Sequence, residues 1–176
     1  MPQINSSTPL LGFCAYSGTG KTTLLTQLIP ILSEEGIRLS VIKHAHHNFD
    51  IDHPGKDSYE LRHSGATQML ISSSKRWALM RELDAGEEEL HLTDLIETLD
   101  HSCTDLILVE GFKNEAIPKI ELHRPSLGHS LICAHDTNVI AVATDEPCSI
   151  PEHLNSLNLN QTNEIAHFIK QHFQLG

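Results

Sequence analysis

The segment AYSGTGKT at residues 15–22 constrains this chain more than any other. It follows PLLGFCA (residues 9–15), a continuous apolar run typical of a strand buried on both faces. It precedes KTTLLTQLIPILSEEG (residues 21–36), whose leucines and isoleucines recur at helical spacing. A strand, a small-residue turn and a helix form the setting of a phosphate-binding loop, G-x-x-x-x-G-K-[ST]. The sequence therefore predicts such a loop between the first strand and the first helix.

The residues of this loop have distinct expected roles. Backbone N–H groups of residues 17–21 converge on a phosphate, and the helix start adds its positive dipole end. Lys21 contributes a full charge to the β and γ phosphates, Thr22 offers a hydroxyl to Mg²⁺, and Thr23 reaches an α phosphate. The candidate nucleotide-binding residues are Ser17, Gly18, Thr19, Gly20, Lys21, Thr22 and Thr23.

Ala15 stands where the motif has its first glycine. Glycine is needed where φ is positive or where a side chain would strike the ligand. Ala15 ends the predicted strand, where an extended backbone tolerates a methyl group. We therefore predict that Ala15 is harmless, the alternative being a chance glycine-rich turn.

A phosphate-binding loop needs a carboxylate close to its metal. DLILVEG (residues 105–111) reads as a buried strand, and Glu110 lies at its carboxyl end, where ligands gather in such sheets. Glu110 is expected to hold Mg²⁺ through a water or to position the attacking water. Lys21 and Glu110 are the catalytic candidates, and Thr22 and Glu110 the metal candidates. A solvated acid at a strand end is the alternative for Glu110.

Predicted strands alternate with predicted helices, which indicates an α/β fold of the P-loop NTPase type, with a mostly parallel sheet and helices on both faces. We predict a single nucleotide-binding domain over residues 1–176. A hairpin inserted at about residues 67–83 interrupts the alternation and is expected at a sheet edge or as a small subdomain. The remaining predicted strands are 38–44, 117–124 and 138–145, and the remaining helices are 57–66, 87–102 and 162–173.

Charge and composition exclude several classes of function. The formal net charge of −11 argues against nucleic-acid or anionic-membrane partners. No apolar run reaches the roughly 18 residues that a membrane helix needs. The four cysteines contain no C-x-x-C pair and suggest neither a disulfide framework nor a thiolate zinc site. We expect a cytoplasmic protein.

Five segments together resemble the MobB family, the molybdopterin-guanine dinucleotide biosynthesis protein B family. They are AYSGTGKTTLL, VIKHAHH, PGKDSYELRHSGA, DLILVEGFK and VIAVATD, and the similarity covers nearly the whole chain in order. The loop alone is unspecific, whereas GKDSYELRHSGA followed by VEGFK is much more specific.

The resemblance implies a GTP-binding protein with weak GTPase activity. Such proteins form homodimers and assist MobA, the guanylyltransferase that joins GMP to molybdopterin. Lys21 and Thr22 match the family's phosphate and metal positions, and Glu110 matches the acid of its VEG motif. Asp57, Ser58 and Arg62 match its DS…R element. Ser58 and Arg62 are therefore further candidates for nucleotide binding. Arg62, four residues after Ser58, either clamps an anion or forms a surface ion pair.

Guanine presents N1–H and N2–H₂ donors side by side, so one carboxylate accepts from both. Asp145 directly follows the apolar run VIAVAT and is the candidate for this contact. The guanine-reading tetrapeptide N-K-x-D is absent, and a plain turn residue before Pro147 is the alternative. Lys113 and Lys119, which flank the loop after Glu110, either bind a pterin phosphate or are solvated.

Other classes of function stay open at this point. His44, His46, His47 and His53 cluster after a predicted strand, where imidazoles at such spacing would suit a metal-delivering GTPase. A plain polar loop is the alternative, since no cysteine or carboxylate set completes a defined site. A small-molecule kinase would use the same loop, but only Arg76 and Arg81 lie near the hairpin as lid arginines. A nucleotide-dependent adaptor with little chemistry of its own is a further class.

Overall fold

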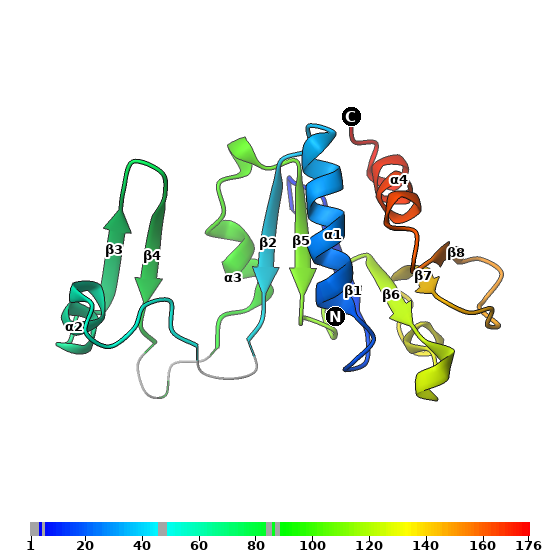
Figure 1. Cartoon of the computed structure of the whole chain (residues 1–176), viewed down its shortest axis with the longest axis horizontal. Helices are drawn as coiled ribbons and strands as arrows, with labels where there is room; N and C mark the ends of the chain where they lie inside the picture. The colour runs from blue at the N-terminus through cyan, green and yellow to red at the C-terminus, as the bar shows by residue number, and fades with distance from the viewer. Residues whose placement is uncertain (1–3, 5, 46–48, 84–85, 87–88) are drawn as a thin grey trace. The chain divides into compact units, whose positions relative to one another are not determined.

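The computed structural model describes residues 4, 6–45, 49–83, 86 and 89–176 (Figure 1). The chain divides into two compact units, one of Met1–His44 and His91–Gly176 and one of Ala45–Leu90. The second unit is larger than the predicted insertion at 67–83, because a helix and its preceding loop belong to it as well. The assignment of both units to a single domain stays a prediction.

The larger unit is built on a six-stranded sheet in the order β2-β5-β1-β6-β7-β8, and every neighbouring pair is parallel. This confirms the predicted α/β fold with a mostly parallel sheet. The strands are β1 (Leu10–Cys14), β2 (Leu39–Lys43), β5 (Leu106–Glu110), β6 (Lys119–His123), β7 (Val139–Thr144) and β8 (Asn155–Asn158). The edge strand β8 was not predicted, because its sequence NSLN carries a single apolar residue.

Helices cover both faces of this sheet, as predicted (Figure 1). Helices α1 (Lys21–Glu34) and α4 (Thr162–Phe173) pack through Leu28 and Ile165 against one face. Helix α3 (Leu92–Glu97) packs through Leu92 and Ile96 against the other face, over β2, β5 and β1. Adjacent strand residues alternate between the two faces, which is why these strands are apolar throughout. Helix α3 is much shorter than the predicted 87–102.

The smaller unit contains helix α2 (Asp57–His63) and the antiparallel strands β3 (Gln68–Ser72) and β4 (Trp77–Arg81). The two strands form a sheet of their own, so the predicted hairpin is confirmed. Leu70 pairs with Leu79, and Ser72 pairs with Trp77. These four side chains share one face of the ribbon, because directly opposed residues point the same way and residues two apart along a strand do so too.

Parallel strands place all their carboxyl ends at one edge of a sheet. The loop after β1, the last residues of β2 and β5, and the residues after β6 and β7 therefore meet at this edge. It is the edge at which α/β sheets of this kind bind ligands.

Candidate functional site

The loop between β1 and α1 has the backbone geometry of an anion site. Gly18 and Gly20 have φ of 81° and 100°, values that L side chains rarely adopt. Gly20 is the N-cap of α1, and no side chain caps this helix end. The first N–H groups of the helix are thus left for an external acceptor.

Thr19 braces this loop from inside. Its side chain is buried, and both its hydroxyl and its N–H donate to the carbonyl oxygen of Tyr16, at 2.8 and 3.3 Å. Thr22 and Thr23, in contrast, lie exposed in the first turn of α1. Direct contacts of these threonines with a nucleotide stay predictions.

Ala15 directly follows the last residue of β1. Among the residues that the structure describes, Gln174 is the one non-glycine residue with a positive φ, so the φ of Ala15 is not positive. The backbone at Ala15 therefore accommodates a side chain without strain. This agrees with the argument that alanine replaces the first glycine of the motif without strain.

Glu110 lies between two lysines. Its Oε2 accepts a hydrogen bond from Lys43 Nζ at 2.7 Å, and its Oε1 is 3.5 Å from Lys21 Nζ. The register of the parallel pair places Lys43 directly beside Glu110. Burial opposes ionisation of this carboxyl, but Lys43 and Lys21 outweigh burial and lower the pKa of Glu110 below its usual value. The site therefore presents an ionised carboxylate and two cations at the mouth of the loop.

The position directly after Glu110 requires a glycine, Gly111. Its φ is +99°, and a Cβ there would lie 2.8 Å from the Cβ of His44 and 3.1 Å from the His44 carbonyl oxygen. The His44 N–H donates to the Glu110 carbonyl at 2.9 Å, which draws the two strand ends together. A side chain at Gly111 would force the ends of β2 and β5 apart.

Arg124, directly after β6, is a site residue that the sequence reasoning missed. Its Nε donates to the Thr19 carbonyl oxygen at 2.8 Å, and its Nη1 pairs with Oδ2 of Asp145. The available signal was its position, since Arg124 follows a buried strand as Asp145 does. Arg124 connects the phosphate loop with the segment after β7.

Asp145 is mostly buried, and one of its oxygens holds Arg124. The other, Oδ1, is buried and accepts no hydrogen bond from any described residue. A buried carboxylate oxygen without a donor is costly, and an external N–H group would satisfy it. The role of Asp145 in reading guanine stays a prediction, to which this oxygen gives a geometric basis.

Arg62 lies in the smaller unit and is buried among carboxylates. Its Nη2 donates to Asp50 at 2.6 Å and to Asp52 at 2.7 Å, and its Nη1 pairs with Glu82. Glu82, Asp52 and Asp50 raise its pKa. This is the ion-pair alternative for Arg62, inside the unit instead of on its surface. Ser58 is also buried, and nucleotide contacts of Ser58 and Arg62 stay predictions.

The histidine cluster is only partly covered by the structure. His46 and His47 lie outside the described residues, His44 belongs to the larger unit and His53 to the smaller. Within the described ranges, no group of three or more His, Cys, Asp or Glu side chains is arranged to hold a metal ion.

Comparison with known proteins gives consistent matches. The family model for MobB, molybdopterin guanine dinucleotide synthesis protein B, matches residues 10–145. The molybdopterin-guanine dinucleotide biosynthesis adapter protein of Escherichia coli (strain K12) is 52% identical over 169 residues, covering 94% of each chain. The adapter protein of the same name from Haemophilus influenzae is 46% identical, covering 95% of this chain and 90% of that protein.

Similar solved structures include a crystal structure of molybdopterin-guanine biosynthesis protein B. It is 28% identical, has a TM-score of 0.69, and the match covers 92% of this chain and 98% of that one. In the part of the chain that the structure describes, none of the helices has the length and apolarity to cross a bilayer.

Proposed function

The chain belongs to the MobB family, and from this premise we propose that it binds GTP with Mg²⁺ and acts in the cytoplasm as an adapter for MobA. MobA is the guanylyltransferase that joins GMP to molybdopterin, and the close relatives carry the name of adapter proteins in this biosynthesis. The observation that carries the proposal is the phosphate loop with Lys21, Glu110 and Lys43 at its mouth.

The residues present suit a magnesium nucleotide. Lys21 and Lys43 offset phosphate charge, the α1 N-terminus offers uncapped N–H groups, and Thr22 and Glu110 supply oxygens of the kind Mg²⁺ prefers. When bound, Mg²⁺ neutralises charge on the β and γ phosphates. Arg124 is held by Thr19 and Asp145, so it is not free to act as an arginine finger in this arrangement. Without an arginine to stabilise the transition state, hydrolysis of GTP is expected to be slow, which is compatible with an adapter role.

Glu110→Gln is expected to lower Mg²⁺-dependent GTP hydrolysis about tenfold or more while GTP affinity changes less than about threefold. General acid–base or water-positioning groups contribute roughly 10²–10⁴ in rate, and a smaller effect of about tenfold is expected here because the proposed hydrolysis is slow. Phosphate release and calorimetry measure the two quantities. Asp105→Asn, at the residue directly before the amino end of β5, is the matched control. Unchanged hydrolysis in Glu110→Gln would remove Glu110 from the catalytic role.

Asp145→Asn is expected to shift the preference from GTP towards xanthosine triphosphate by about tenfold. A paired carboxylate–guanine contact is worth about 1–3 kcal/mol, and the new amide donates to the C2 carbonyl of xanthine. Competition binding with both nucleotides measures the ratio. Arg124→Gln keeps the carboxylate but loses the ion pair, so it should retain the preference for GTP. An unaltered ratio in Asp145→Asn would mean that guanine is read elsewhere.

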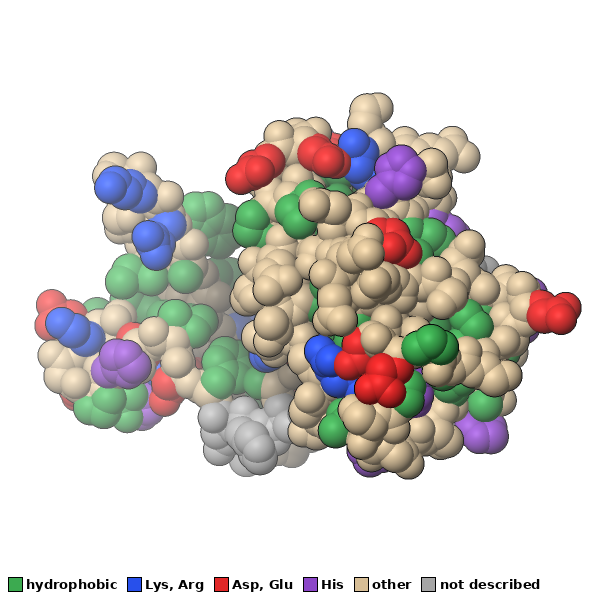
Figure 2. Space-filling view, turned by 45° about the vertical axis from the view of Figure 1, so that its right-hand side comes forward, with side chains coloured by type: hydrophobic (Ala, Val, Ile, Leu, Met, Phe, Trp, Pro, Cys, Tyr) green, Lys and Arg blue, Asp and Glu red, His purple; other side chains and the backbone are tan. Residues whose placement is uncertain are grey.

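The exposed hairpin face suggests how the protein assembles. Leu70, Leu79 and Trp77 are 61%, 53% and 70% exposed on one face of the β3–β4 ribbon. Figure 2 shows hydrophobic side chains gathered on the surface of the smaller unit. A two-stranded ribbon with such a face is marginally stable alone, and pairing of two copies through it would form the homodimer typical of the family.

Trp77→Glu is therefore expected to convert dimers into monomers, because it introduces a charge at the centre of an apolar contact. Sedimentation velocity measures the change. Lys75→Glu, in the turn of the same hairpin, should leave the dimer intact. A monomeric parent protein would rule out this mode of assembly.

Reconstitution tests the proposed function as a whole. Purified MobA, molybdopterin, GTP and Mg²⁺ should form the guanine dinucleotide faster or in higher yield when this protein is added, and Lys21→Ala should give no such gain. An identical yield with and without the protein would contradict the adapter role.

A further inference from the structure

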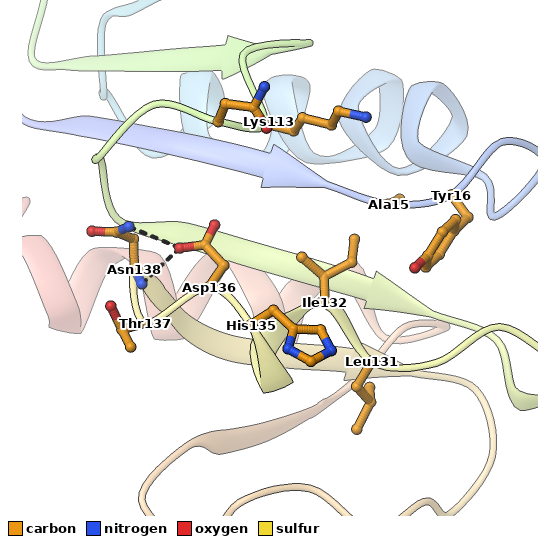
Figure 3. A pocket seen from close by; sticks show the side chains of 10 residues that line it. Ala15, Tyr16, Lys113, Leu131, Ile132, His135, Asp136, Thr137 and Asn138 are labelled. Atoms are coloured by element: carbon orange, nitrogen blue, oxygen red, sulfur yellow. Dashed lines mark hydrogen bonds between the residues drawn. The ribbon is translucent and has the colours of Figure 1, made fainter. Parts of the chain in front are cut away.

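A pocket of about 560 Å³ opens beside the phosphate loop, within the larger unit (Figure 3). Ala15 and Tyr16 at the start of the loop form one side, and Lys113 and Asn114 after β5 form another. The third side is the segment 131–138, which leads into β7. Its volume falls within the 300–1,000 Å³ typical of small-molecule sites.

Two charged residues of β6, buried almost completely, hold two of these walls in place. Lys119, 1% exposed, donates from Nζ to Asp136 Oδ2 at 2.7 Å and to the Glu115 carbonyl. Glu121, 0% exposed, accepts the N–H groups of Ile132 and Cys133 at 2.7 and 2.8 Å. Lys119 and Glu121 are two residues apart and so point to the same face of the sheet.

The strand beside them is shaped to fit Lys119. A Cβ at Gly12 of β1 would lie 3.0 Å from Lys119 Cγ, so a glycine makes room for the lysine stem. Well-packed apolar residues often stabilise a core as much as buried charges do. The charges are therefore better explained by what they position, which is the pair of loops that line the pocket. The prediction that Lys119 is solvated or binds phosphate directly is wrong, because its ammonium lies inside the fold.

The pocket has the chemistry for a planar ligand that carries an anion. Lys113 is exposed and makes no ion pair with a described residue, while Asp136 is offset by Lys119 and accepts from Asn138. Lys113 is thus the cation at the opening that is left without a carboxylate partner among the described residues. Ala15 and segment 131–138 add apolar surface, and the Tyr16 ring stacks on His129 at 4.2 Å between centroids. Asn114 and Asn138 add amide groups.

We propose that this pocket binds a phosphorylated pterin, with the phosphate at Lys113 and the ring between the loop residues and segment 131–138. The proposal rests on the proposed function, in which the partner enzyme acts on molybdopterin. Because Ala15 and Tyr16 belong to both the pocket and the phosphate loop, pterin and GTP would lie side by side on one protein. Pterin and guanine share a 2-amino-4-oxo pyrimidine edge, so the test must separate the two ligands.

A fluorescence titration with a monophosphorylated pterin tests this site, since binding changes pterin emission. Unmodified protein should bind the probe, and Lys113→Gln should weaken binding at least tenfold. Lys75→Gln, an exposed lysine of the hairpin, should bind as the parent does. The unphosphorylated pterin should bind more weakly and should respond little to Lys113→Gln, because its contact with the lysine is missing.

GTP titrations on the same proteins separate the two proposals. Probe binding that survives both saturating GTP and Lys21→Ala supports a separate pterin pocket. Competitive displacement by GTP would assign the pocket to the nucleotide base and overturn the inference. GTP binding without pterin binding would overturn the inference alone, and absence of both would overturn the proposed function as well.

Discussion

Replacing Lys21 with alanine is expected to weaken GTP binding at least about 30-fold. Lys21 opens α1 at the phosphate loop, and its Nζ lies 3.5 Å from Glu110. In the complex with GTP, Lys21 would form a close charge pair with the phosphates. Removing one partner of such a pair typically costs about 2–5 kcal/mol of binding free energy, and a 30-fold loss of affinity corresponds to the lower end of this range. Lys43 stays in place on the other Glu110 oxygen and offsets only part of the lost charge. Calorimetric titration with GTP measures the change.

The fold should survive this substitution, because a lysine at a helix N-terminus opposes the helix dipole instead of stabilising it. Circular dichroism and thermal unfolding check this point. Lys75→Ala is a matched control on an exposed lysine of the smaller unit. GTP affinity within a factor of three of the parent value would refute the phosphate-loop assignment.

Replacing Lys119 with methionine is expected to lower the free energy of unfolding by about 3–5 kcal/mol. Methionine fills much of the space of the lysine stem, but the change leaves Asp136 without its cation and the Glu115 carbonyl without its donor. Removing one member of a buried ion pair has a cost of about this size. Urea unfolding followed by circular dichroism measures it.

The double variant Lys119→Met with Asp136→Asn serves as the control, because it removes both charges together. It should recover part of the lost stability, since no unpaired charge is left in the interior. Exposed Lys56→Met should change stability by less than about 0.5 kcal/mol. A cost below about 1 kcal/mol for Lys119→Met would show that the buried pair does not hold the pocket wall.

Sequence patterns located the edge of the sheet that carries the site. Glu110 and Asp145 were placed there because each follows an apolar run, and the parallel sheet brings both runs to the same edge. The same reasoning applied to IPKIELHR would have included Arg124. The pairing of Lys43 with Glu110 depends on strand order and register, which a single sequence does not specify.

Residues whose role depends on tertiary partners were the hardest to predict. Lys119 looks solvated in sequence because lysine is almost never fully buried without a partner, and its partner Asp136 is 17 residues away. The carboxylates around Arg62 come from segments on both sides of it, so its ion pairs were only one alternative. Strand β8 lies at an edge and carries little apolar pattern to reveal it.

Calorimetric titration of GTP, with and without the purified guanylyltransferase, tests the adapter role most directly. GTP should bind the protein alone, and ATP should bind more weakly. An adapter whose GTP-bound form binds the guanylyltransferase better must in turn bind GTP more tightly when the guanylyltransferase is present, because coupling between two ligands is reciprocal. Equal binding of GTP and ATP, together with a GTP affinity that the guanylyltransferase leaves unchanged, would contradict the account.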